Sequence, residues 1–194
     1  MDRTSALFFA FLALLAFGAV WMIGAYNRLI RLRNRIDAAW AEVDVQLTKR
    51  HDLVPNLVAV VQGYSTHERS TLDEVVEARS AAISAQGPQD QAHAENMLTG
   101  ALGRLFAQAE DYPELKADGS FEQLQARLDS IESTLAMARQ AYNLSVQAYA
   151  NVTQTIPTNF VAWFNSFEPR EFLSADDGYR AAPRVELPPA AQAS

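Results

Sequence analysis

The chain has 194 residues, a formal net charge of −7 and no cysteine. The lack of cysteine excludes a disulfide framework, a thiolate zinc site, an iron–sulfur cluster, a cysteine nucleophile and a lipidated cysteine. The acidic balance disfavours nucleic acid as a partner, because nucleic acid attracts basic surfaces.

The first predicted element is a single membrane anchor over about residues 5–25, within an N-terminal segment 1–25. No charged residue occurs between Arg3 and Arg28, and about 20 helical residues span about 30 Å, the thickness of a bilayer core. A cleaved signal peptide is the alternative, but its apolar region would be shorter and followed by a small-residue cleavage site. The residues expected to contact lipid or the lipid–water interface are Ala6, Phe9, Phe11, Leu15, Phe17, Trp21 and Tyr26.

A basic stretch follows the anchor. Residues 26–50 carry six positive and three negative side chains. Positive charge resists translocation, so this bias favours a cytoplasmic location for the rest of the chain. The residues could instead serve helix packing or contact anionic lipid headgroups. They are Arg28, Arg31, Arg33 and Arg35.

Residues 26–155 are predicted to form an antiparallel bundle of four long helices, which makes the fold all-α. Pro55, Pro88 and Pro113 divide this region into four amphipathic runs, and proline marks a helix boundary or a kink. In the second run Asp52 could be a helix cap, but the apolar stripe passes through Pro55 almost in phase. Two separate helices and one long kinked rod therefore both remain possible there.

The fourth run is the most regular. From Phe121 to Val152 its apolar residues follow a strict three–four spacing, which is typical of bundle and coiled-coil helices. Ser120 is predicted to cap this helix, with Gln123 at the capping-box position.

Several motifs together resemble the LemA family over about residues 20–187. The last two read Ile-Pro-Thr-Asn-Phe and Phe-Glu-Pro-Arg-Glu-Phe. In chain order, the motifs are residues 26–57, 62–68, 75–79, 100–117, 138–143, 156–160 and 167–172.

The resemblance implies a bacterial, membrane-associated helical bundle with a poorly defined biochemical role. Relatives often lie near genes for a membrane metalloprotease or for phosphatase-like membrane proteins, and a magnetosome protein of membrane formation looks like a distant member. Some relatives carry a lipobox cysteine before the Tyr26-Asn27 pair, where this chain has Ile23-Gly24-Ala25. A spanning helix thus replaces the lipid here. Those lipidated relatives favour an extracytoplasmic bundle, against the arginine bias.

The motifs that carry chemistry are missing from the sequence. The nearest to a di-metal signature is a single Asp90-x-x-His93, whereas a four-helix di-metal site needs two Glu-x-x-His pairs and further inward carboxylates. We therefore expect no metal, no cofactor and no catalytic residue. A few polar residues fall near the apolar stripes and could be buried links that fix helix register or a charged patch for a partner: Arg33, Gln46, His67, Glu68 and Arg79.

An aromatic segment, residues 156–173, follows the bundle. It could fold back as a cap, or it could be a docking surface for another subunit, a partner or the bilayer. The candidate surface consists of Phe160, Trp163, Phe164, Phe167 and Phe172, with Trp163 and Phe164 as the hypothesised anchors of self-assembly. The tail, residues 174–194, is acidic and then rich in alanine and proline, and we expect it to be mostly disordered.

These features predict a non-enzymatic, single-pass scaffold of the bacterial inner membrane. Its expected partners are the lipid bilayer and other copies of itself, and it would organise or remodel the membrane. The alternative is an adaptor for an integral-membrane protease or signalling protein.

Overall fold

The computed structural model describes residues 3–64 and 69–173 as helices joined by short connections. The helices are α1 (Arg3–Tyr64), α2 (Arg69–Ser84), α3 (Gly87–Ala109), α4 (Pro113–Lys116), α5 (Gly119–Gln154) and α6 (Thr158–Phe164). These described residues form no strand. The predicted all-α class is confirmed. The predicted tail, residues 174–194, lies outside the described residues, as do His67 and Glu68.

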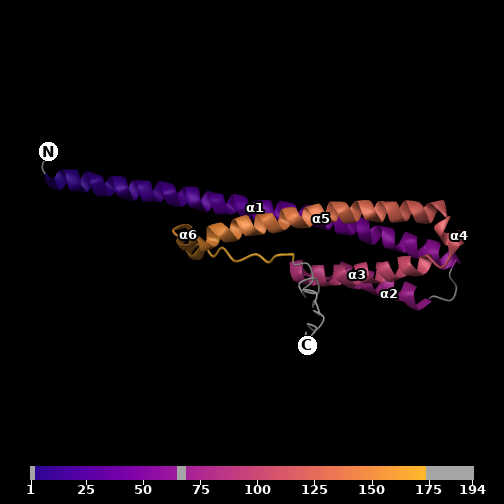
Figure 1. Ribbon diagram of the computed structural model, residues 1–194. Helices are drawn as coiled ribbons and strands as arrows, with labels where there is room; N and C mark the ends of the chain where they lie inside the picture. Colours follow the sequence, from indigo (N-terminus) through magenta and orange to yellow (C-terminus); the bar gives the residue numbers. More distant parts are fainter. Residues whose placement is uncertain (1–2, 65–68, 174–194) are drawn as a thin grey trace, which may run out of the picture.

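Helix α1 runs the full length of the molecule (Figure 1). Its 62 residues would extend roughly 90 Å at 1.5 Å per residue. Pro55 lies inside this helix, so Pro55 is not a helix boundary and Asp52 is not a cap. The rod that the sequence left possible is the observed arrangement, and the second predicted run is divided between the end of α1 and α2.

Helix α5 lies antiparallel to α1, and α2 and α3 form a hairpin beside the half of α1 that is remote from its N-terminus (Figure 1). The remote half is therefore four helices thick, whereas α1 and α5 pair alone nearer the N-terminus. The predicted boundary before α3 is confirmed at Gly87, whose φ of 82° lies in the left-handed region that glycine tolerates.

The predicted stripe of α5 is confirmed by burial. Phe121, Leu128, Leu135, Tyr142 and Tyr149 are all buried, so one face of this helix contributes to the core over its whole length. The predicted cap was wrong. The Asp118 carboxylate accepts from the backbone N–H groups of Ser120 at 2.7 Å and Phe121 at 3.4 Å. Capping thus occurs two residues earlier, because a carboxylate there satisfies two free N–H groups.

Two apolar cores follow from this arrangement. The distal core lies among α1, α2, α3, α4 and α5, around Val54, Leu98 and Leu105. The proximal core lies mainly between α1 and α5, around Leu29, Val43 and Val146, and also includes residues of α6 and the segment after it.

Candidate membrane surface and buried polar cluster

The N-terminal part of α1 exposes its apolar side chains. Among the described residues, α1 is the one helix long and apolar enough to cross a bilayer. Ala6 lies in α1, but its side chain is outside what the structure describes. The other predicted anchor residues are all exposed: Phe9, Phe11, Leu15, Phe17, Trp21 and Tyr26. Apolar side chains in this number are stable in an apolar surrounding, not in water.

The basic residues occupy the next turns of α1. Arg28, Arg31 and Arg35 are exposed and lie just beyond the apolar run. Arg33 is also exposed, and its guanidinium lies 5.9 Å from the centre of the Phe167 ring. A cation over an aromatic face is a stabilising contact. Arg33 thus packs against the aromatic segment, while the side chains of the other three arginines are exposed on α1.

The aromatic segment is both a cap and an exposed surface. Val161 and Ala162 of α6 are buried against the bundle. Phe167 is partly buried and lies edge-on to Tyr26, with ring centres 5.7 Å apart. The opposite side of α6 presents Phe160, Trp163 and Phe164 at 65%, 81% and 78% exposure, and Phe172 is exposed further along the chain.

Residues 165–173 begin with a turn at Asn165 and Ser166 and then lie along α5 as a strap. The hydroxyl of Tyr149 donates to the Glu168 carbonyl and that of Tyr142 to the Glu171 carbonyl, each at 2.9 Å. Asn143 exchanges two hydrogen bonds of 2.9 Å with the Leu173 backbone. Burial raises the pKa of both tyrosines, which keeps their hydroxyls protonated as donors.

A hollow separates α6 from the end of the apolar run. Its volume is about 450 Å³, and its lining comes from two distant parts of the chain: Trp21, Met22, Pro157, Phe160, Val161, Trp163, Phe164 and Asn165. The folding of α6 onto the bundle therefore places its aromatic side chains beside the last turns of the candidate span.

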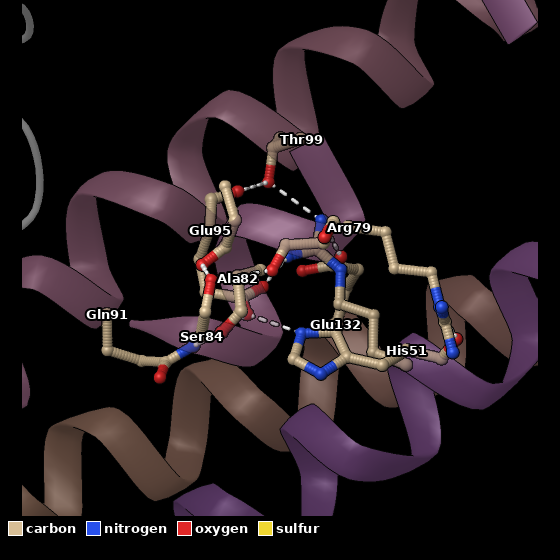
Figure 2. A network of polar contacts seen from close by, with 11 residues as sticks. His51, Arg79, Ala82, Ser84, Gln91, Glu95, Thr99 and Glu132 are labelled. Carbon is tan, nitrogen blue, oxygen red and sulfur yellow. Dashed lines mark hydrogen bonds and ion pairs between the residues drawn. The ribbon is translucent and has the colours of Figure 1, made fainter. Parts of the chain in front are cut away.

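A buried polar cluster lies where the two cores meet (Figure 2). Arg50 and Glu95 are 1% and 0% exposed and form an ion pair. The Nε2–H of His51 donates to Glu95 Oε1 at 2.7 Å, and Gln91 Nε2 donates to the same oxygen at 3.0 Å. Arg50 Nη2 also reaches Glu132 Oε1 and Thr99 Oγ1, each at 2.7 Å. The cluster thus joins α1, α3 and α5.

The pKa of Glu95 reflects this setting. Burial by itself would raise it, but the hydrogen bond from His51 and the charge of Arg50 outweigh burial and lower it below the ordinary value. Glu95 is therefore ionised, and both of its oxygens already accept hydrogen bonds. Such a carboxylate stabilises helix register and has little capacity left for acid–base chemistry.

Pro55 explains the role of Arg79. Proline has no N–H, so Pro55 cannot donate to the carbonyl of His51, four residues earlier. Arg79 Nε donates to that carbonyl at 2.7 Å. A residue of α2 therefore satisfies the backbone group that proline leaves free in α1.

Of the polar residues that the sequence predicted as buried links or a charged patch, the described ones do not form one cluster in the structure. Arg79 forms the link just described, and Gln46 is buried and donates to Glu42 at 2.8 Å. Sequence reasoning missed Arg50 and Glu95. A signal was present, because Arg50 continues the three–four stripe between Leu47 and Val54.

Within residues 3–64 and 69–173, no group of three or more His, Asp or Glu side chains could hold a metal ion. His93 and Asp90 are both exposed.

The fold and these surfaces define a class: an α-helical bundle whose first helix extends into an exposed apolar segment. Comparison with known proteins agrees, because the model of the LemA family matches residues 39–187. The chain belongs to the LemA family.

Named relatives extend this result. The chain is similar to magnetosome protein MamQ 2 of Paramagnetospirillum magneticum, at 23% identity over 84% of this chain and 69% of the relative. It is similar to protein LemA of Metamycoplasma hominis, at 24% identity over 80% of this chain and 72% of the relative. The candidate span and the family membership together indicate a membrane-associated protein.

Proposed function

We propose that the protein is a non-enzymatic scaffold, anchored by a single span in the bacterial inner membrane, that self-associates and organises or remodels the bilayer. The observation that carries the proposal is the continuity of α1. The helix continues from the exposed apolar segment into both cores without a break. A bundle joined to its span in this way transmits the orientation of the span directly, as a scaffold requires.

The buried polar cluster supports a structural role. Glu95 and Arg50 are almost fully buried, and they are paired with each other and with neighbours from other helices. A catalytic acid or base needs access to a substrate and a free proton site. Neither is available to Glu95. The names of the MamQ relatives associate them with the magnetosome, which agrees with a role at a membrane.

The importance of an unbroken α1 can be tested by breaking this helix between the span and the bundle. Asn27 is exposed, so Asn27→Pro removes a backbone donor there without removing a core side chain, and Asn27→Ala is the matched control. The full-length proteins are reconstituted in phosphatidylcholine–phosphatidylglycerol vesicles, and vesicle shape is imaged by electron cryomicroscopy. Assembly size is measured by light scattering in mild detergent.

We expect the native chain and Asn27→Ala to form large homo-oligomers and to change vesicle shape. Asn27→Pro remains membrane-bound but leaves the vesicles unchanged. A native chain that stays monomeric on unchanged vesicles contradicts the scaffold. The adaptor alternative predicts such a monomer together with a stoichiometric complex with an integral-membrane protease or signalling protein.

A further inference from the structure

Within residues 3–64 and 69–173, no protein neighbour covers the side of α6 that faces away from the bundle. Phe160, Trp163 and Phe164 occupy one side of this helix at i, i+3 and i+4, and each is at least 65% exposed. Val161 and Ala162 bury the other side against the bundle. We name Phe160, Trp163 and Phe164 the α6 aromatic face. A helix with one packed side and one exposed aromatic side needs a second apolar environment.

The position of this face identifies that environment. Trp21 and Met22 of the apolar run line the same hollow as the α6 aromatic face. Trp21 lies four residues before Ala25, where the apolar run ends, which is about 6 Å at 1.5 Å per residue. An interfacial helix places its apolar side about 5–10 Å into the boundary between headgroups and acyl chains. The distance of Trp21 from the end of the apolar run therefore lies within the depth that an interfacial helix reaches.

Charge gives an independent argument. Residues 140–167, which include the end of α5 and all of α6, contain no charged side chain. The first charged residue after this stretch is Glu168, and the first charged residue after the apolar run of α1 is Arg28. Neither α6 nor the apolar run of α1 therefore carries a charge that would oppose contact with the hydrocarbon side of the headgroups. Tryptophan suits this level, because its ring is apolar and its N–H reaches water or headgroups.

We infer that α6 is a second membrane contact, whose aromatic face inserts into the leaflet where the α1 span ends. This inference rests on the proposed α1 anchor and extends it. With two contacts, the bilayer fixes the rotation and tilt of the bundle as well as its attachment. The occupant is lipid, because the face continues the surface of the span, and a second copy of the chain is the competing occupant in the test.

The test uses the three native tryptophans of the full-length protein. Trp21 lies in the span, Trp163 on α6, and Trp40 is half-buried in the proximal core against Tyr142. Replacing two of the three with phenylalanine leaves one reporter in each variant. The variants are reconstituted in phosphatidylcholine–phosphatidylglycerol vesicles in which the phosphatidylcholine is brominated on its acyl chains. Quenching by bromine and by aqueous acrylamide is then measured.

We expect brominated lipid to quench Trp163 to an extent comparable with Trp21, and acrylamide to quench it weakly. Trp40 is the matched control and remains unquenched by brominated lipid. If Trp21 is quenched and Trp163 is reached only by acrylamide, the α6 contact is wrong and the anchor stands. If neither quencher reaches Trp163, a second copy covers the face and the lipid contact is again wrong. If Trp21 escapes brominated lipid, the proposed anchor itself fails.

A second measurement avoids changing Trp40. The native chain has no cysteine, so Phe164→Cys accepts a single nitroxide label, and Ser133→Cys on an exposed part of α5 is the control. We expect oxygen to relax the label at 164 more than a water-soluble nickel complex does, with the reverse at 133. The same accessibility at both sites would overturn the inference.

Discussion

The half of the bundle remote from the anchor packs four long helices and the short α4 around a distal core, whereas the half beside the anchor pairs α1 mainly with α5. The distal half therefore buries an apolar stripe from each of four helices. The proximal half lacks the α2–α3 hairpin over most of its length and is completed by α6 and the strap of residues 165–173, which hydrogen bonds hold to α5. The proximal half thus has fewer helices, and side-chain hydrogen bonds to the backbone of the strap contribute to its packing.

The two halves meet at the buried polar cluster. Arg50 on α1, Glu95 on α3 and Glu132 on α5 bring three helices into one register. An ion pair in a core is often no more stabilising than apolar residues of the same size, but loss of one partner is strongly destabilising. The cluster is therefore where a single change should affect both halves.

The largest effect is expected for Glu95→Gln. The change leaves the Arg50 charge buried without its carboxylate, although Glu132 still pairs with Arg50. We expect the free energy of unfolding to fall by about 3 kcal/mol, the lower end for breaking a buried pair. Thermal unfolding of the full chain in mild detergent, followed by circular dichroism, measures the change.

The matched control is Glu74→Gln, which removes the same charge from an exposed pair with Arg104. Exposed pairs contribute about 0–1 kcal/mol. Equal losses in the two variants would show that the buried cluster has no special role in joining the halves.

Arg79→Ala tests the link between α1 and α2. The variant leaves the His51 carbonyl without the donor that replaces the missing N–H of Pro55. A hydrogen bond from a charged group is worth about 1.5–3 kcal/mol, and we expect a loss in this range by the same unfolding measurement.

A double-mutant cycle isolates the cause. Pro55→Ala restores a backbone N–H, so Arg79→Ala should cost clearly less in the Pro55→Ala background. The same cost in both backgrounds would mean that Arg79 acts through something other than the His51 carbonyl.

Acid should weaken the protein through Glu95. Its pKa is lowered in the folded state, so its contribution is complete above the unfolded value of about 4.3 and is lost as pH falls through the folded pKa. Arg50, His51, Glu132 and Arg139 share this environment. Because burial opposes the lowering, the effect should be smaller than that of Glu95→Gln.

The comparison variant for acid unfolding is again Glu95→Gln, which has no carboxyl at this position to titrate. The melting temperatures of the native protein and of Glu95→Gln should converge as the pH is lowered below about 5. A constant difference across that range would exclude Glu95 as the titrating group.

The sequence predicted what depends on local pattern. The stripe of α5 and the apolar run of α1 follow from the three–four spacing and from the absence of charge, and both are features of single helices. The His51 carbonyl that Pro55 leaves free accepts from Arg79 in another helix, and no local pattern contains that contact. The side of α6 that faces outward likewise depends on how the helix packs, which residue type alone does not specify.

The smallest effect is expected for Tyr149→Phe, which tests the strap of the proximal half. The change removes one hydroxyl that donates to the Glu168 carbonyl at 2.9 Å, a loss of about 1 kcal/mol. Because the bond holds residues 165–173 and no distal helix, the effect should be local. We expect faster amide hydrogen exchange in residues 167–173, with exchange in α2 and α3 unchanged.

Tyr64→Phe supplies the same chemical change in the distal half, where the exposed hydroxyl donates to Asp118 at 2.8 Å. Removal of this bond leaves the distal core packed by its apolar side chains, so exchange in residues 167–173 should stay at the native rate. If Tyr149→Phe instead speeds exchange in α2 and α3 as much as in the strap, the two halves unfold as one unit. Their different packing would then have no separate effect on stability, because opening of the proximal half would always open the distal core with it.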